Sequence, residues 1–387
     1  MPNESKKYIV FGSPYIGKEE IAEMAKTLKS GWIGTGPKAA RFENDLCRYT
    51  GARYGLALNS CTAGLHLSLL VSGIGPGDEV ITTPLTFCAT VNTIIHSGAR
   101  PVFIDVDPKT MNMDANRIEE AITKHTKAIM PVHLAGRPCE MDKITQIARK
   151  YKLLVIEDAA QAIGSEYKGR KIGSIGDLTC FSFYVTKNII TGEGGMVMTD
   201  NKEFADKIKV YALHGMSKDA WKRFSDDGYR HYQVIFPGYK YNMTDMQASL
   251  GIHQLKRIGR FDKKRQKIWD QYNAAFFGLP IGLPAPIGKD IHHNKHLYTL
   301  LVDKKKAGVS RDEFMRRLHE RGIGTGVHYI PVHLHQYYRE RFGYKPGGFP
   351  NAEYIGERTV SIPLSARLTK EEIKRIIKAV KEAVLNK

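Results

Sequence analysis

Short apolar runs alternate with amphipathic segments through the first half of the chain. The apolar runs are long enough for buried strands, and the segments between them carry apolar residues at helical spacing. Strand, helix and strand in this order form a unit whose two strands lie parallel in one sheet. The pattern therefore predicts an α/β fold. Its expected strands span 54–58, 79–83, 101–106 and 128–133, and its expected helices 62–72, 86–97, 115–124 and 141–151.

The run Lys152–Asp158, KLLVIED, is apolar until it ends in two acids. Such a run is typical of a parallel strand that is buried on both faces. Ligands of open α/β sheets bind at the carboxyl ends of the strands, so we expect Asp158 at a binding site. A carboxylate there can keep the ring nitrogen of pyridoxal 5'-phosphate (PLP) protonated. The alternative is that Asp158 only caps the next segment.

A lysine stands in a polar turn between two predicted strands. Lys187 follows the alternating apolar run over 179–184. It precedes a glycine-rich stretch, 192–195, and a second strand over 196–199. A lysine held between two strands loses contact with water, which lowers the pKa of its amine and leaves a neutral nucleophile. The alternative is an ordinary solvated lysine.

The sequence NSCTA, residues 59–63, joins a predicted strand to a predicted helix. The first N–H groups of a helix have no partner within the helix and favour an anion. This turn is therefore a candidate phosphate site. As an alternative, Ser60 or Thr62 serves only as the helix N-cap.

The composition is ordinary for a globular protein: 387 residues, 42% hydrophobic and 25% charged. This length accommodates one large core and a smaller domain. The N-terminal sequence MPNESKKYIV is polar, and no apolar run approaches the roughly 18 residues of a membrane span, so we expect neither a leader peptide nor a span. The five cysteines form no CxxC pair, which favours reduced thiols and a cytoplasmic location.

The formal net charge of +18 makes nucleic acid a partner to consider. The basic residues are spread along the chain, and neither helix-turn-helix nor zinc-finger spacing is present. We therefore expect no nucleic-acid partner, and the charge favours an anionic substrate. Histidines cluster at 292–296 and 328–335 without the ligand spacing of a metal site, so no metal is predicted.

Three stretches make the chain recognisable: VIEDAAQA, SFYVTKNIITGEGG and PGYKYNMTDMQASL. Together they resemble the DegT/DnrJ/EryC1/StrS family of sugar aminotransferases, and the likeness extends from GWIGTGP at 31–37 to the C-terminal helix. The resemblance implies the PLP-dependent transferase fold type I (aspartate aminotransferase-like). A large PLP-binding domain over 1–257 would hold a mostly parallel seven-stranded sheet, and a smaller C-terminal α+β domain would span 258–387.

The resemblance also implies roles for individual residues. Lys187 would be the catalytic lysine that bonds PLP covalently and moves a proton, and Asp158 would hold the ring nitrogen. Ser182 resembles the family's phosphate-binding serine, and Gln161 the residue near the ring and its 3-oxygen. The other implied cofactor contacts are Cys61, Thr62 and Ala63 at the phosphate, Phe87 against the ring (by itself Phe87 is also a plausible core residue), and Asn242, which would reach the phosphate of the neighbouring subunit's cofactor.

The implied reaction moves an amino group, with L-glutamate as donor, to the keto carbon of a nucleotide-linked sugar in amino-sugar, cell-surface polysaccharide or lipopolysaccharide biosynthesis. Lys240, His328 and Tyr329 are candidate contacts to this sugar, and a surface lysine is the alternative for Lys240. Because Asn242 would cross a subunit interface, the resemblance also implies a homodimer with shared active sites.

Among family members, the chain looks most like those that aminate C4 of a UDP-sugar, such as the UDP-4-amino-4-deoxy-L-arabinose-forming enzyme. GWIGTGPK, RGIGTGVHY and YYRERFGY carry this likeness. Gln161 departs from the histidine of that enzyme, which leaves the sugar open. The alternatives are C3 amination of a dTDP- or GDP-keto-sugar and a non-catalytic PLP-binding regulator. Lys187 argues against the family's dehydratases, which have histidine there.

Overall fold

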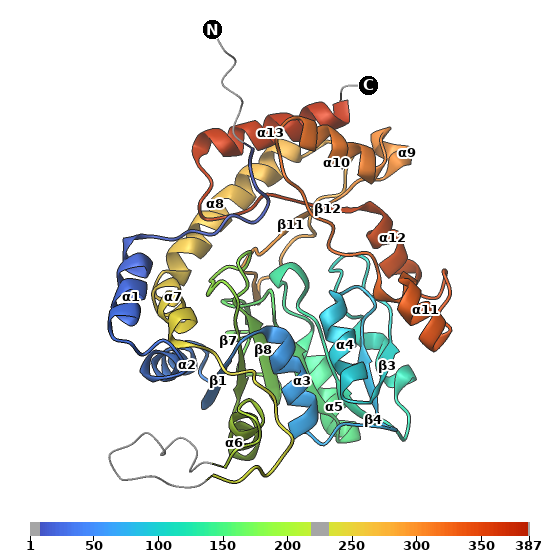
Figure 1. Ribbon diagram of the computed structural model, residues 1–387. Helices are drawn as coiled ribbons and strands as arrows, with labels where there is room; N and C mark the ends of the chain where they lie inside the picture. Colours follow the sequence, from blue (N-terminus) through green and yellow to red (C-terminus); the bar gives the residue numbers. More distant parts are fainter. Residues whose placement is uncertain (1–7, 218–231, 386–387) are drawn as a thin grey trace.

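The computed structural model describes residues 8–217 and 232–385 (Figure 1). A seven-stranded sheet forms the middle of the larger part, in the order β1-β9-β8-β5-β4-β2-β3. β9 runs antiparallel to both neighbours, and the other neighbouring pairs are parallel. The predicted α/β class with a mostly parallel sheet is confirmed. The strands are β1 (Tyr54–Leu58), β2 (Glu79–Thr82), β3 (Arg100–Phe103), β4 (Thr126–Ile129), β5 (Leu154–Asp158), β8 (Leu178–Ser182) and β9 (Gly195–Thr199).

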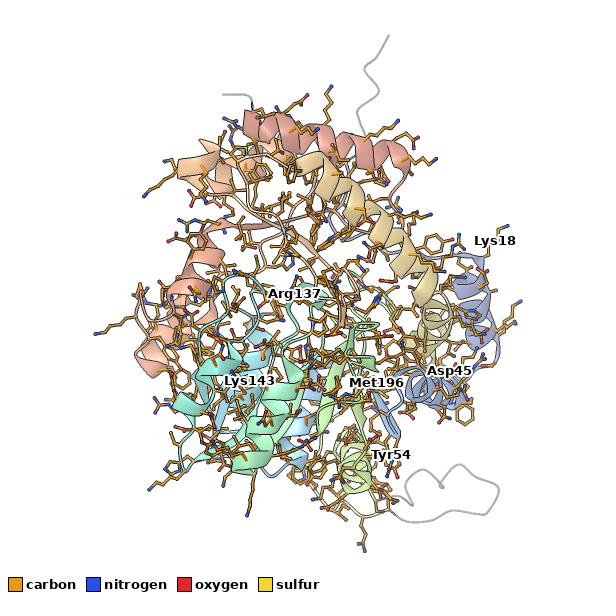
Figure 2. All side chains as sticks on the ribbon, turned by 180° about the vertical axis from the view of Figure 1, so that it is seen from behind. Lys18, Asp45, Tyr54, Arg137, Lys143 and Met196 are labelled. Atoms are coloured by element: carbon orange, nitrogen blue, oxygen red, sulfur yellow. The ribbon has the colours of Figure 1, made fainter. Side chains whose placement is uncertain are left out.

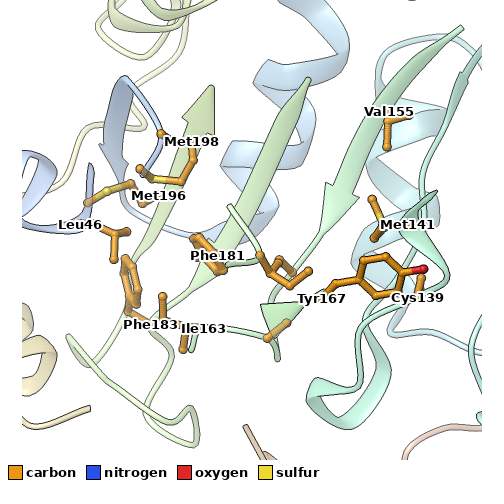
Figure 3. Close-up of a cluster of buried hydrophobic side chains, with 14 of the residues drawn as sticks. Leu46, Cys139, Met141, Val155, Ile163, Tyr167, Phe181, Phe183, Met196 and Met198 are labelled. Atoms are coloured by element: carbon orange, nitrogen blue, oxygen red, sulfur yellow. The ribbon is translucent and has the colours of Figure 1, made fainter. Parts of the chain in front are cut away.

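Both faces of this sheet are buried, and the side chains of each strand alternate between two cores. Val197 packs into one core, whereas its neighbours Met196 and Met198 pack into the other, as Phe181 does (Figure 3). This alternation explains why the strands are apolar throughout. One face is covered by α3 (Cys61–Val71), α4 (Cys88–His96) and α6 (Lys202–Tyr211), and the other by α2 (Pro37–Thr50), α5 (Met141–Tyr151) and α7 (Asp245–Lys256).

A separate core lies above the sheet in Figure 1, where α8 and α13 cross. The helix α8 contributes Ile258 to a core of the sheet and Ile268 to this second core, which also includes Ile9. The division of the chain before residue 258 remains a prediction. The second core is built from α8 (Ile258–Phe276), β11 (Tyr298–Leu301), α10 (Arg311–Glu320), β12 (Thr359–Ile362) and α13 (Lys370–Leu385).

Short elements complete the described chain. Arg137, near the middle of the molecule in Figure 2, is buried and donates hydrogen bonds to the carbonyl oxygens of Ala285 and Pro286, at 2.5 and 2.9 Å. It therefore ties the sheet to the segment that follows α8. The other elements are the helix α1 (Lys18–Lys29) and the shorter β6 (Glu166–Tyr167), β7 (Arg170–Lys171), β10 (Ile291–His292), α9 (Lys304–Ala307), α11 (Gln336–Phe342), α12 (Pro350–Arg358) and the 3-10 turns at Ala115–Arg117, Glu119–Ala121, Leu134–Gly136 and Val332–Leu334.

The helix predicted over 115–124 is wrong: two 3-10 turns occupy this segment. The carboxylate of Asp114 accepts a hydrogen bond from the N–H of Asn116, and the N–H of Arg117 bonds back to the Asp114 carbonyl. These local bonds favour a tight turn over a continuous helix. The sequence over 214–243, rich in Tyr, Gly, Asp and Arg and with little periodicity, also predicts a long loop, and residues 218–231 of it lie outside the described residues.

All five cysteines are free thiols, and Cys61, Cys139 and Cys180 are buried. The expectation of reduced cysteines agrees with this arrangement. Within residues 8–217 and 232–385, the structure contains no helix with the length and apolar character needed to cross a membrane.

One buried carboxylate fastens the glycine-rich loop at 31–36 to the rest of the fold. Asp245, at the start of α7, accepts hydrogen bonds from the N–H groups of Gly36, Lys38 and Ala39 at 2.8, 3.0 and 2.9 Å. Gly36 precedes α2 and has no side chain with which to cap it, so Asp245 takes over that task from another helix. The loop and the first turn of α2 therefore depend on this contact.

We predict that Asp245→Ala lowers the free energy of unfolding by about 2–4 kcal/mol, because it leaves one buried and two partly buried N–H groups without their acceptor. Urea titration followed by circular dichroism measures the change. The matched control is Asp312→Ala, whose side chain is 80% exposed; its effect should stay within about 0.5 kcal/mol. Equal effects of the two substitutions would contradict this account.

Candidate active site

A cavity of about 670 Å³ opens where the parallel strands of the sheet end. Segments just after β1, β2, β4, β5 and β8 all line it. This is the edge at which open α/β sheets bind ligands, and the volume suits a cofactor together with part of a substrate. Nine of the predicted residues line the cavity: Cys61, Thr62, Phe87, Asp158, Gln161, Ser182, Lys187, His328 and Tyr329.

Lys187 lies in the turn between β8 and β9. Its backbone N–H bonds to the carbonyl of Tyr184 at 2.9 Å, and the turn closes where the Thr191 N–H meets the carbonyl of Phe183 at 2.8 Å. Ile189 and Ile190, further along the turn, are buried and anchor it. Burial lowers the pKa of the Lys187 amine, while the negative charge of Asp158 acts in the opposite direction. The amine therefore loses its proton more readily than a surface lysine.

Asp158 is buried at the carboxyl end of β5, and its orientation is fixed by hydrogen bonds. Thr90, on α4, donates to Oδ2 at 2.7 Å, and the Ala160 N–H donates to Oδ1 at 3.1 Å. The hydroxyl of Thr86 lies 2.7 Å from that of Thr90, one helical turn away. The carboxylate therefore faces the cavity in one defined orientation.

The N-terminus of α3 meets the start of β9 with no space between them. A Cβ on Gly195 would lie 2.3 Å from the carbonyl carbon of Ser60 and 2.4 Å from the nitrogen of Cys61, so only glycine allows this approach. Ser182 is paired with Gly195 across β8 and β9. The helix N-terminus and the Ser182 hydroxyl consequently face the same end of the cavity, an arrangement suited to a phosphate.

Gln161 and Tyr329 form a connected pair on the cavity wall. The Gln161 Oε1 accepts a hydrogen bond from the Ala135 N–H at 2.6 Å, and its Nε2 donates to the Tyr329 hydroxyl at 2.7 Å. The hydroxyl hydrogen of Tyr329 is therefore left to donate elsewhere, and burial raises the pKa of this tyrosine. Phe87 stands nearby, with its ring 5.9 Å from that of Tyr329, and is 57% exposed toward the open cavity.

His328 lies opposite, stacked on Phe11 with ring centroids 5.4 Å apart. Its Nδ1 is 2.9 Å from the Ser361 hydroxyl. Burial, and the positive charge of Lys187 after it, lower the pKa of His328 to about 4. The imidazole is therefore neutral at physiological pH.

Three predicted site residues lie outside the cavity lining of this chain. The Ala63 N–H bonds to the Ser60 hydroxyl at 3.0 Å, so Ser60 caps α3 and leaves the N–H groups of Cys61 and Thr62 for a ligand. Lys240 is exposed. Asn242 donates to the Thr35 hydroxyl, and its Oδ1 is buried without a hydrogen-bond partner in the described structure.

Other cavity residues were not anticipated from the sequence. The sequence alone points neither to Thr86, which lines the cavity just before α4, nor to Thr90, which holds Asp158 from α4. His296 was considered only as a metal ligand. Segments far apart in the sequence meet here, and no local sequence pattern predicts such contacts. The further lining residues include Phe11, Tyr184, Thr186 and Glu193.

The sequence matches a family model over residues 14–381, and that model describes the DegT/DnrJ/EryC1/StrS aminotransferase family. The chain belongs to this family. It is an aminotransferase, and PLP is its cofactor.

Its relatives match it over nearly the whole length. The spore coat polysaccharide biosynthesis protein SpsC of Bacillus subtilis is 51% identical over 386 residues, which are 99% of each chain. The PLP form of a putative sugar aminotransferase from Streptococcus pneumoniae is 36% identical, with a TM-score of 0.90 over 97% of this chain and 98% of that chain. Helicobacter pylori PseC, an aminotransferase involved in the biosynthesis of pseudoaminic acid, is 30% identical, with a TM-score of 0.90 over 98% and 99%.

The residues present fit PLP. Gly195 lies directly against Ser60 and Cys61 at the start of α3, where the N–H groups of Cys61 and Thr62 are left for a ligand. This junction suits an anionic phosphate. The buried carboxylate of Asp158 matches a protonated ring nitrogen. The buried amine of Lys187 matches an aldehyde carbon.

We predict that Gly195→Ala weakens PLP binding at least about tenfold, equivalent to about 1.4 kcal/mol, because the added methyl group pushes α3 away from β9. Equilibrium titration of the cofactor-free chain with PLP, followed by absorbance, measures the change. Gly259→Ala is the matched control, since a Cβ there meets no atom within 4 Å. Unchanged PLP affinity in a folded Gly195→Ala variant would refute phosphate binding at this junction.

Proposed function

We propose that this protein transfers the amino group of L-glutamate to the keto carbon at C4 of a UDP-linked keto-sugar, in the synthesis of an amino sugar for a cell-surface polysaccharide or lipopolysaccharide. The observation that carries the proposal is the meeting of Lys187 and Asp158 in one buried cavity at the carboxyl edge of the sheet. A regulator that binds PLP without turnover is the alternative, and an assay of steady-state transamination separates the two.

PLP supplies an electron sink that makes the hydrogen on the amino-bearing carbon acidic. Asp158 would hold the protonated ring nitrogen, and Thr90 keeps the carboxylate in place. Ser182, Cys61 and Thr62 would hold the phosphate. Lys187 would accept a proton at Nζ and return it to a neighbouring atom, a task for which a lowered pKa is suited. The buried surroundings exclude water from these charges.

The sugar would enter over Phe87, His328 and Tyr329. The hydroxyl of Tyr329 and the neutral ring of His328 can exchange hydrogen bonds with sugar hydroxyl groups. Support for a sugar substrate comes from the Streptococcus relative, a putative sugar aminotransferase, and from the Helicobacter relative, which is involved in pseudoaminic acid biosynthesis. Support for a polysaccharide pathway comes from the Bacillus relative, a spore coat polysaccharide biosynthesis protein. The preference for C4 and UDP rests on the likeness of GWIGTGPK and RGIGTGVHY to C4-aminating enzymes.

The test is turnover with glutamate and a panel of nucleotide keto-sugars that differ in nucleotide and in keto position. We expect 2-oxoglutarate and a 4-amino sugar from the UDP-4-keto members. Lys187→Ala should abolish product formation, because it removes the amine that would move the proton, whereas Lys256→Ala, a change at an exposed lysine, should not. Preference for a 3-keto dTDP- or GDP-sugar would overturn the substrate, and no turnover with any member would overturn the reaction.

The proposal includes a homodimer whose active sites are shared. Apolar side chains lie exposed on α1 and in the loop after it: Ile21, Leu28, Trp32 and Ile33. Ile21 and Leu28 are two helical turns apart and thus share a face of α1. Asn242 donates a hydrogen bond to the hydroxyl of Thr35 in this loop. Its Oδ1 has no hydrogen-bond donor within the described residues. A second copy that covers this surface would also bring Asn242 toward its neighbour's site.

We predict that Ile21→Glu with Trp32→Glu converts a dimer into a monomer, since charges buried in an interface cost far more than they recover. Sedimentation velocity measures the mass. As a control, the exposed Tyr354 and Phe277 on other surfaces can be replaced by Glu without loss of the dimer. A monomeric unsubstituted protein would contradict the shared site.

A further inference from the structure

His296 is placed beside Lys187 by a segment that comes more than a hundred residues later in the chain. It is 5% exposed and lines two cavities, the large one and a small one that reaches Phe11. Lys187 and Thr186 line both of the same cavities. The part of the His296 imidazole that is not covered by protein therefore faces a cavity that Lys187 also lines.

The partners of Asn188 determine which nitrogen of His296 carries hydrogen. The Asn188 Nδ2 donates to the carbonyl oxygen of Asn294 at 2.9 Å, so its Oδ1 is the atom that lies 3.0 Å from the His296 Nδ1. An amide oxygen only accepts hydrogen bonds. The hydrogen therefore sits on Nδ1, and in the neutral ring Nε2 carries a lone pair.

The Nε2 atom is open to the cavity. It has no hydrogen-bond partner in the described part of the chain. Unlike the Nε2 of His66, which also lacks a partner, it is not fully enclosed by protein. The backbone of His296 is fixed on both sides, because its N–H bonds to the Ala135 carbonyl at 3.1 Å and its carbonyl accepts from Arg265 at 3.3 Å. The lone pair is thus held in place.

The surrounding charges keep this ring neutral. Burial lowers the pKa of His296 well below its usual value, and Lys187, Arg265 and His328 act in the same direction. Around Lys187 itself, the groups that favour its charged form are Cys61 and Asp158. A neutral acceptor on the opposite wall would add to them.

We propose that His296 is a positioning residue for Lys187: its Nε2 accepts a hydrogen bond from the Lys187 amine when that amine, free of the cofactor, turns toward it. In the described structure the two side chains line the same cavity without a hydrogen bond between them. Asn188, the next residue after the lysine, locks the ring in the tautomer that this contact requires. The contact holds the amine in one direction between proton transfers. This inference rests on the proposed function, in which Lys187 moves the proton.

The test measures the protonation of Lys187 without turnover. The full chain, freed of cofactor and checked by circular dichroism, is treated with acetic anhydride over a range of pH, and acetylation of Lys187 is followed by peptide mass spectrometry. An acceptor stabilises the ammonium form, so its removal lowers the midpoint. We expect His296→Met to lower the midpoint by about 1 pH unit or more, whereas His296→Gln, of similar shape, keeps an acceptor and stays near the unsubstituted value.

The matched control is His293, which is equally buried in the same segment and does not line the cavity of Lys187. His293→Met should leave the midpoint unchanged. An unchanged midpoint in a folded His296→Met variant, or an equal shift in His293→Met, would overturn the proposal. Because the measurement involves neither donor nor sugar, a failed aminotransferase assay does not change its meaning.

A second measurement applies even where His296→Met does not fold. Nitrogen-15 spectra of the unsubstituted chain with labelled histidine, assigned by comparison with His296→Gln, report the tautomer directly. We expect a neutral ring with hydrogen on Nδ1 at pH 7. Hydrogen on Nε2, or a charged ring, would overturn the proposal.

Discussion

The proposed chemistry of this protein depends on one physical constraint, the removal of the Lys187 amine from water. Lys187 lies in a turn whose apolar residues, Ile189 and Ile190, are buried and whose ends continue into β8 and β9. Its ammonium form loses hydration there, and Asp158 offsets only part of that loss. The sheet therefore holds the turn in place. Because the turn buries Lys187, this lysine loses its proton more readily than a solvated one.

The remaining parts of the site follow from how that turn is held. β9 is the antiparallel strand of the sheet, and its first residue, Gly195, touches the N-terminus of α3 without space for a side chain. The same strand thus ends the turn of Lys187 and lies against the start of α3, where we propose that the phosphate binds. Asp158 ends β5, which is separated from β9 by β8 in the sheet. Thr90, on α4, fixes the orientation of its carboxylate. The sheet and the helical layer that contains α3 and α4 thus both contribute to one site.

Much of this arrangement is predictable from local sequence. The apolar run that ends in Asp158 and the lysine between two strands are patterns of single segments, and both residues reach the cavity. The glycine-rich stretch at 192–195 is visible in the sequence and allows a close backbone approach, whereas the contact of Gly195 with Ser60 is not visible there. Ala63 failed to reach the cavity because the Ser60 hydroxyl takes its N–H, a competition that the N-cap alternative had already described.

Other contacts are invisible to local patterns. The bond between Asn188 and His296 joins positions 108 residues apart, so neither segment announces it. Nothing in the local sequence distinguishes Thr90 from other polar residues of its helix, and its role comes from the hydrogen bond to Asp158. The tight turns at 115–121 depended on one side-chain bond of Asp114 that overrode a helical pattern.

The most direct test of the central claim is to reduce the PLP-loaded protein with borohydride and to identify the modified peptide by mass spectrometry. The account predicts a pyridoxyl group on Lys187, in the peptide that joins β8 to β9. Modification of a different lysine, or no covalent modification of a protein that binds PLP, would contradict it.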